Sequence, residues 1–199
     1  MTTTVEMSSI LRDEDVRKMI IGAAGRIFQK YGLNRATMED IAQEAGKAKS
    51  TLYYYFSSKE EIFETIVTIE FINLLEAGRA AATEAGSAKE KLRRYIAASL
   101  LGMKNAANVC SIARGEIKGK HELLERLRTK FTAMEESIVK EMVTYGAQTN
   151  EFTFADAKEL DSTVKITVGI IHAMELYLFV EDYDSDQVDL AAKLLANGV

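Results

Sequence analysis

The chain has 199 residues, 47% hydrophobic and 28% charged, and its 25 lysines and arginines against 30 aspartates and glutamates give a net charge of −5. These proportions are typical of a globular chain, and a lone Cys110 excludes a disulfide scaffold. No stretch approaches the roughly 20 apolar residues that span a bilayer, so no membrane partner is expected. The first nine residues lack a basic head and an apolar segment, so the expected location is cytoplasmic.

The composition favours helices throughout. The chain has no proline, and its 12 glycines are the main residues that interrupt helices. Residues 10 to 64 carry nine basic and nine acidic side chains, and residues 45 to 59 carry three lysines and no acid. This local basic patch is compatible with an anionic partner or with an ordinary solvated face. The sequence predicts an all-α fold.

The first predicted helix covers residues 13 to 31, where apolar side chains recur at steps of three and four. We expect Gly32 to end it, with Leu33 folding back on the last turn. Residues 37 to 45 predict a short second helix, with Thr37 as N-cap, Asp40 completing a capping box and Gly46 at its end.

A third helix is predicted at residues 49 to 56, only three or four residues later. Ser58 and Glu61 predict a capping box for a long fourth helix that reaches about residue 85. Further helices are predicted at residues 88 to 107, 109 to 118, 121 to 145, 154 to 180 and 185 to 196. Since helix is predicted to continue from residues 57 to 62 into the rest of the chain, the first three helices and the remainder should be mechanically coupled.

Two short helices joined by a glycine-containing turn form the pattern of a helix-turn-helix. A helical wheel centred on Leu52 places Tyr53 and Phe56 on the inward half of the third helix. The outward half carries Ser50, Thr51 and Tyr54, with Lys49 and Tyr55 on the flanks. The short side chains at residues 50 and 51 would let the helix approach a major groove about 12 Å wide.

This segment resembles the DNA-binding domain of the TetR family of bacterial transcriptional regulators. The most specific matches are Ala24, Phe28, Gly32, Thr37, Ile41, Ala42, Ala45, Gly46, residues 51 to 56 and residues 58 to 60. The resemblance implies a homodimer in which each subunit joins a three-helix DNA-binding head to an all-α body of about six helices. It places the head at residues 10–57, with the helix-turn-helix at about 36–56, and the effector-binding and dimerisation body at 58–199.

By position, the resemblance implies that Thr37, Tyr53, Tyr55 and Lys59 hold phosphates and that Lys49, Ser50, Thr51 and Tyr54 lie against bases. The sequence departs from the family at Lys47 and Ala48, where an apolar residue and a capping serine or threonine are usual. Losing that cap should cost about 1 kcal/mol locally. Lys47 would offset this by a phosphate contact, or the recognition helix would be loose until DNA binds.

The helix predicted at residues 154 to 180 has two apolar stripes. One contains Leu160, Val164, Thr167, Ile171, Met174 and Leu178, and the other contains Ile166, Ile170, Ala173, Tyr177 and Val180. A helix with two apolar faces must bury one of them outside its own bundle, which supports a dimer independently of the resemblance. The predicted dimer interface consists of Ile166, Ile170, Ala173, Tyr177, Val188, Ala191 and Leu195.

Candidates for the effector pocket are apolar or neutral-polar side chains of the body. They are Met103, Asn105, Cys110, Phe131, Met134, Tyr145, Thr167 and His172. Ordinary core packing is the alternative for each, because methionines and aromatics at helical spacing usually fill space. His172 within an apolar helix is more often a hydrogen-bonded core residue than a ligand contact.

The sequence predicts a dimeric DNA-binding regulator, a repressor that leaves a palindromic operator on double-stranded DNA when a small apolar or amphipathic effector enters the body. The alternative is a DNA-organising or protein-interaction protein that uses the same head without an effector. With two histidines, one cysteine and no metal-ligand or phosphate-loop spacing, we expect no enzyme activity, metal or cofactor.

Overall fold

The computed structural model describes residues 2–103, 106, 108–109, 119–180 and 184–198, without the side chains of residues 2–12 and 176–180. Its helices are α1 (Thr2–Arg35), α2 (Met38–Ala45), α3 (Lys49–Tyr55), α4 (Lys59–Thr83), α5 (Ala88–Met103), α7 (His121–Gln148), α8 (Ala157–Val180) and α9 (Ser185–Gly198). In the described residues all regular structure is helical, so the predicted all-α class is confirmed. The helix predicted at residues 109 to 118 lies almost wholly outside the described residues.

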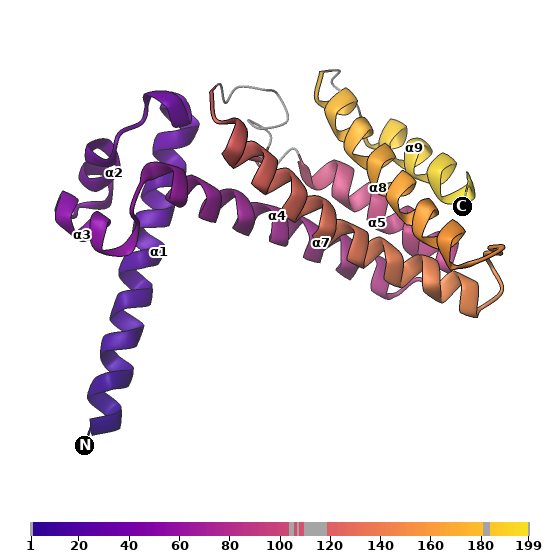
Figure 1. Cartoon of the computed structure of the whole chain (residues 1–199), viewed down its shortest axis with the longest axis horizontal. Coiled ribbons are helices and arrows are strands. Elements are labelled where there is room, and N and C mark those ends of the chain that lie inside the picture. Colours follow the sequence, from indigo (N-terminus) through magenta and orange to yellow (C-terminus); the bar gives the residue numbers. More distant parts are fainter. Residues whose placement is uncertain (1, 104–105, 107, 110–118, 181–183, 199) are drawn as a thin grey trace.

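The helices form two groups joined by α4. Figure 1 shows α2 and α3 packed beside α1 at one end, while α4 leads away from them into a bundle with α5, α7, α8 and α9. We call α1 to α3 the head and the remaining helices the body. The N-terminal half of α1 extends beyond the head, because this helix begins at Thr2 rather than at the predicted residue 13.

Local sequence signals set the ends of the head's helices. Gly32 has φ 72° and ψ 160°, which interrupts α1 where the sequence predicted, and Leu33 behind it is buried. Thr37 and Asp40 make the predicted capping box, since the Thr37 side chain accepts from the Asp40 N–H at 3.1 Å. Gly46 ends α2 in the left-handed conformation with φ 61°.

The start of α4 differs in one detail from the predicted capping box. The Ser58 hydroxyl accepts from the Glu61 N–H at 3.2 Å, as expected. The Glu61 carboxylate, however, accepts from the backbone N–H and the hydroxyl of Ser57, both at 2.7 Å. These bonds lower the pKa of Glu61. The chain entering α4 is therefore fixed on both sides of the helix start.

The head has an apolar core to which all three of its helices and α4 contribute. Ile20 of α1, Ile41 of α2 and Leu52 of α3 are fully buried. Phe28 meets Phe63 of α4 edge to face, with ring centroids 5.4 Å apart. The first turns of α4 are therefore part of the head's packing, and α4 connects the two groups without a flexible link.

In the body, α5 packs against α4, α7, α8 and α9. Two glycines permit its close approach to α4. A Cβ on Gly78 would lie 2.8 Å from the ring of Tyr95, and a Cβ on Gly102 would lie 2.5 Å from Leu74. Larger residues at these two positions would force the helices apart, so the seam between α4 and α5 is tightly packed.

The seam between α4 and α7 is polar at its edge. Glu60 pairs with Lys120 at 2.8 Å, and Glu64 pairs with Arg126 at 2.9 Å. Further along, Arg79 pairs with Glu141 at 2.7 Å. Residue numbers rise together on both helices, so α4 and α7 run parallel and are joined by successive, partly exposed ion pairs.

The two apolar stripes of α8 have different surroundings within one subunit. Val164, Thr167 and Ile171 are buried among the body helices, whereas Ile166 is 62% exposed and Ile170 is 39% exposed. Ala173 is exposed with them, and the side chain of Tyr177 lies outside the described set. The stripe that contains Ile166 is therefore the one free to meet another molecule.

The structure corrects the predicted interface on α9. Val188 is buried in its own subunit, and Ala191 and Leu195 are half-buried. The reason is that a stripe spaced by four, at Val188, Ala192 and Ala196, packs inward. The large apolar side chains that α9 leaves exposed are Leu190 at 57% and Leu194 at 67%.

Candidate DNA-binding site and body cluster

The outward surface of α3 is exposed and chemically varied. Leu52 and Phe56 are buried and fix the helix to the head, whereas Ser50 and Tyr54 point to solvent, Tyr54 with 76% of its surface exposed. Thr51 is half-buried. A helix anchored on one face and carrying hydroxyl and aromatic side chains on the other has the form of a helix that contacts base edges in a major groove.

Tyr53 does not lie where the helical wheel placed it, whereas Tyr55 lies on a flank as expected. Tyr53 was expected on the inward half but is 51% exposed. Tyr55 is half-buried, packs against the core, and donates its hydroxyl to Asp13 of α1 at 2.8 Å. That hydrogen bond raises the pKa of Tyr55. The wheel could not anticipate this, because α1 passes on the side of Tyr55 rather than that of Tyr53.

The N-terminus of α3 has no side-chain cap. Ala48 occupies the N-cap position with an extended backbone, and its methyl group accepts no hydrogen bond. Thr51 donates its backbone N–H to the Ala48 carbonyl at 2.9 Å, which leaves the N–H groups of Lys49 and Ser50 for an outside acceptor in the part of the chain described. Lys47, just before the cap, is half-buried and donates its backbone N–H to Ala42 at 3.0 Å.

Lys49 is held across the motif by a surface ion pair. Its ammonium lies 3.2 Å from the carboxylate of Glu39 in α2, and both side chains are largely exposed. An exposed pair of this kind is worth little, about 0 to 1 kcal/mol. A phosphate or a base edge could therefore replace Glu39 as the partner of Lys49.

Lys59 has a structural contact that the sequence did not reveal. Its ammonium donates to the carbonyl oxygens of Asn34 at 3.2 Å and Ala36 at 2.7 Å. These carbonyls lie at the end of α1 and just beyond it, so Lys59 ties the start of α4 to the rest of the head. Thr37 is similarly engaged, because its hydroxyl donates to Asp40 at 2.6 Å and lowers the pKa of that carboxyl.

The predicted effector residues do not gather around one cavity in the described part of the chain. Phe131 stacks on Phe71 at 4.1 Å, and Met103 and Thr167 are buried. Met134 is half-buried beside an open groove of about 260 Å³, and Tyr145 lines another of about 430 Å³. Asn105 and Cys110 lie outside the described residues.

His172 belongs to a buried polar cluster that spans three helices. Its Nε2 lies 2.7 Å from Glu135 of α7, and Glu135 also accepts from the Tyr95 hydroxyl of α5 at 3.2 Å. Glu135 is only 1% exposed. The sequence signal was present, because Glu135 falls in register with Phe131, Ile138 and Met142 on the buried face of α7. An acid at such a position is unusual in a core.

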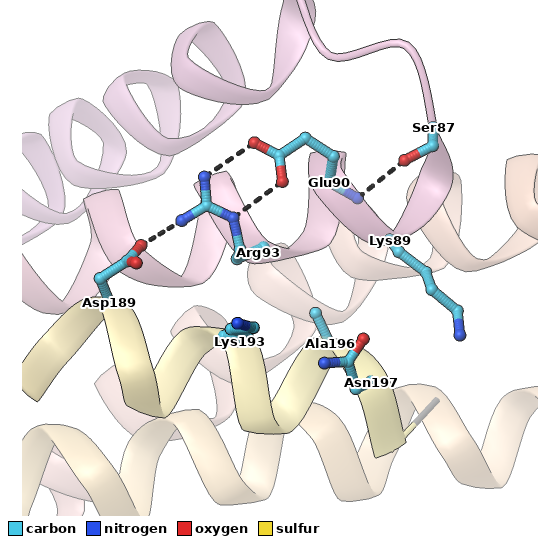
Figure 2. A pocket seen from close by; sticks show the side chains of 8 residues that line it. All are labelled: Ser87, Lys89, Glu90, Arg93, Asp189, Lys193, Ala196 and Asn197. Carbon is cyan, nitrogen blue, oxygen red and sulfur yellow. Dashed lines mark hydrogen bonds and ion pairs between the residues drawn. The ribbon is translucent and has the colours of Figure 1, made fainter.

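A second polar surface lies between α5 and α9 and is shown in Figure 2. It is an open groove of about 400 Å³ in which the Arg93 guanidinium lies between Glu90 and Asp189. The two arginines Arg93 and Arg94 lower the pKa of Glu90 to about 2. The carboxylates of Glu90 and Asp189 are thus paired with Arg93 of the same chain, and the ion pair between Arg93 and Asp189 connects α5 to α9.

Within the described ranges, no three histidine, cysteine, aspartate or glutamate side chains come together as metal ligands would. Among the helices described, none has a stretch both long and apolar enough to cross a bilayer.

The fold and the site define a helix-turn-helix head on an all-α body. Residues 20–66 match the family model described as "Bacterial regulatory proteins, tetR family". Over these residues the chain resembles the DNA-binding domain of the tetR family.

Individual relatives resemble the chain over different lengths. The uncharacterised HTH-type transcriptional regulator YhgD of Bacillus subtilis is 39% identical over 27% of this chain and 28% of its own length. The fatty acid metabolism regulator protein of the same species is 25% identical over 66% of this chain and 68% of its own length. The chain thus matches under a third of the first of these relatives.

Solved structures extend the likeness in fold to the body. The crystal structure of the transcriptional regulator FadR from Bacillus subtilis, in complex with stearoyl-CoA, has a TM-score of 0.74 with 22% identity. The match covers 92% of this chain and 98% of that one. At this identity the likeness concerns the fold of head and body together.

Proposed function

We propose that the protein is a dimeric transcriptional regulator that binds a palindromic operator through α3 and leaves it when a small apolar or amphipathic effector enters the body. The observation that carries the proposal is the outward face of α3, with Ser50 and Tyr54 exposed on a helix fixed by Leu52 and Phe56. Exposed side chains on a rigid, short helix after a glycine turn are what direct base contact requires.

The proposed base contacts are made by Lys49, Ser50, Thr51 and Tyr54. Lys49 would exchange its Glu39 carboxylate for DNA, and the uncapped N-terminus of α3 would bring N–H groups to a phosphate. Since α3 lacks its own cap, a DNA phosphate at its N-terminus would stabilise the helix in addition to binding the protein to DNA.

The proposed phosphate contacts are made by Thr37, Lys47, Tyr53, Tyr55 and Lys59. Lys59 would keep its carbonyl partners and direct its remaining N–H toward DNA, so its contribution is partly structural. Tyr55 would contact DNA only by sharing its hydroxyl with Asp13. Tyr53, which has no such constraint in its exposed position, is the freer of the two tyrosines.

The proposed dimer interface is the exposed apolar face of α8 and α9. It consists of Ile166, Ile170 and Ala173, with Leu190 and Leu194 replacing the buried Val188. Two helices from each subunit would pack as a four-helix bundle across a twofold axis. This arrangement would place two copies of α3 about one helical turn of DNA apart, near 34 Å.

For the effector, the relatives supply a first class to test. One is described as a fatty acid metabolism regulator, and one solved neighbour binds stearoyl-CoA. Both descriptions support an effector with a long apolar chain, and we propose a fatty acyl compound as the first candidate. The effector would favour a dimer in which the two α3 helices no longer match the operator spacing.

The test is selection of bound sequences from a random duplex library by the purified protein at two salt concentrations. An enriched palindrome with half-sites one helical turn apart is expected, and Tyr54→Ala should change its sequence preference. Tyr145→Ala, which removes a partly exposed tyrosine of the body, is the matched control and should leave the preference unchanged. Salt-sensitive binding without a motif would instead favour a DNA-organising role, and no binding would refute both.

A further inference from the structure

Glu39 is an acidic side chain on the surface that the proposed function turns toward DNA. It is the second residue of α2, its side chain is 70% exposed, and its carboxylate lies 3.2 Å from the ammonium of Lys49 at the start of α3. The neighbouring Met38 and Ile41 are buried, so Glu39 lies on the outer side of α2. Because Lys49 is a proposed base contact, its partner Glu39 lies at the same surface.

The DNA backbone gives Glu39 no favourable partner. The other acid in the first turn of α2, Asp40, is engaged within the protein, because it accepts from the backbone N–H of Thr37 at 2.9 Å and from its hydroxyl at 2.6 Å. This capping box fixes the backbone from which Glu39 projects. Phosphates repel a carboxylate, so Glu39 in this place lowers the affinity for DNA in general. A favourable contact for Glu39 has to come from a base.

The major groove offers a partner to each member of the ion pair. Guanine presents two acceptors there, O6 and N7, and cytosine presents its N4 amino group as a donor. Lysine donates to guanine O6 and N7, and glutamate accepts from cytosine N4. A lysine and a glutamate side by side are therefore complementary to a guanine and a cytosine side by side.

The spacing of the two side chains matches one G·C base pair. Guanine O6 and cytosine N4 are joined by a hydrogen bond of the base pair and lie about 2.9 Å apart. The ammonium of Lys49 and the carboxylate of Glu39 are 3.2 Å apart. Each side chain can thus exchange the other for a base atom while staying near its place in the free protein. The exchange costs little, because both side chains are exposed and such pairs are weak.

The other three base pairs fit less well. C·G and A·T present the donor and the acceptor on the opposite strands, so Lys49 would meet an amino group and Glu39 a carbonyl oxygen. T·A has the right order, with thymine O4 as acceptor and adenine N6 as donor. It places the thymine methyl group, however, on the side where guanine offers N7 to Lys49. G·C is therefore the pair that satisfies both side chains.

We propose that Glu39 and Lys49 together read one G·C base pair in each half-site, with Lys49 on guanine and Glu39 on cytosine. Glu39 is thus a specificity-determining residue on α2, outside the recognition helix α3. It weakens binding to most sequences and is compensated at one base pair, which sharpens discrimination. This inference rests on the proposed binding of DNA through α3.

The experiment exchanges the two charges and repeats the selection from a random duplex library. The double variant Glu39→Lys with Lys49→Glu keeps both charges on the same surface in opposite places. We expect the parent to enrich G·C at one position of each half-site and the double variant to enrich C·G there, each by at least about tenfold over the reversed pair. Circular dichroism should show the parent's helix content, since both side chains are exposed. A double variant that selects the parent's base pair at every position would overturn the proposal.

A single variant decides the matter if the double variant selects no motif. Glu39→Gln removes the charge and should bind random duplexes at least about threefold more tightly at low salt, because the repulsion from phosphates falls. It should also lower the discrimination between G·C and C·G at that position by at least about threefold. Glu44→Gln is the matched control, because Glu44 is also on α2 and paired at the surface, with Arg26 at 2.6 Å. It should keep the parent's base preference, and a Glu39→Gln protein that keeps it too would overturn the proposal.

These outcomes separate the inference from the proposed function. A parent protein that selects a palindrome, together with variants of Glu39 that leave the base preference unchanged, would remove Glu39 from base recognition and leave the regulator function intact. A parent protein that selects no sequence would remove the regulator function, and the proposed base pair with it.

Discussion

The head and the body place their polar groups in opposite ways. In the head, buried positions are apolar and the hydroxyl, aromatic and basic side chains of α3 lie at the surface, as Leu52 and Tyr54 illustrate. In the body, some surface charges form ion pairs between helices, such as Arg79 with Glu141 and Arg126 with Glu64, while Glu135, Glu175 and Ser99 are buried. A surface that contacts a large, solvated polyanion needs exposed donors. A site for a small molecule needs polar groups that are shielded from water.

The largest effect is expected where the head depends on a single buried side chain. Leu52→Ala should lower the free energy of unfolding by about 2 to 4 kcal/mol, because Leu52 is fully buried and its removal leaves a cavity under α3. Urea denaturation measures this. Leu101→Ala removes the same atoms from a 40% exposed site on α5 and should cost much less. A stable Leu52→Ala protein would show that α3 is not anchored as described.

In the body, replacing the buried carboxyl of Glu175 should raise the free energy of unfolding instead of lowering it. Since the pKa of folded Glu175 is raised from 4.5, the folded state binds the proton more tightly than the unfolded state, and stability falls as pH rises above 4.5. Because glutamine does not titrate, the Glu175→Gln variant does not lose stability in this way. At neutral pH its free energy of unfolding should exceed that of the parent by a difference on the order of 1 kcal/mol. The difference should shrink toward pH 4.5.

Thermal unfolding from pH 4.5 to pH 8 would follow this difference. The carboxyls whose pKa is lowered, such as Asp40 and Glu61, are the same in both proteins and cancel in the comparison. A Glu175→Gln protein with the parent's pH dependence would mean that Glu175 is solvated rather than buried.

A smaller gain is expected from restoring the missing cap of α3. Ala48→Ser supplies a hydroxyl acceptor for the first turn of α3, which no side chain caps, and should stabilise the head by about 0.5 to 1 kcal/mol. Hydrogen exchange of the α3 amides measures it locally. Ala48→Val is the control, because valine is as poor an N-cap as alanine, and it should bring no such gain. If the added cap weakened DNA binding, the open N-terminus would be implicated in holding a phosphate.

The smallest effect on stability is expected at the exposed tyrosine of α3. Tyr54→Ala should change the free energy of unfolding by no more than about 0.5 kcal/mol, because the side chain is 76% exposed. Chemical denaturation would test this, with Tyr55→Phe as the comparison, since that change removes the hydrogen bond to Asp13. A large loss at Tyr54 would assign it to the fold instead of to the exposed surface.

The parts of the fold that the sequence predicted are those set by neighbouring residues. Thr37 with Asp40, Gly46, and Ser58 with Glu61 fix helix ends within a few residues of themselves, and each appears in the structure. Tyr53 and Val188 were misplaced because their burial depends on which helix passes beside them. Glu175 was overlooked because an acid is expected at the surface, although it continues the buried spacing of Val164, Val168 and Ile171.

The close contact between Gly78 and Tyr95 makes Gly78 the point about which α4 can tilt as a rigid helix. The ion pairs along α7 are partly exposed and can shift at little cost, whereas the α4 and α5 backbones cannot separate at Gly78 without opening a void. At about 1.5 Å per residue, the start of α4 at Lys59 lies about 28 Å from that point. A tilt of about 5° at Gly78 would therefore displace the head by about 2.5 Å, comparable to the 3.4 Å rise between base pairs.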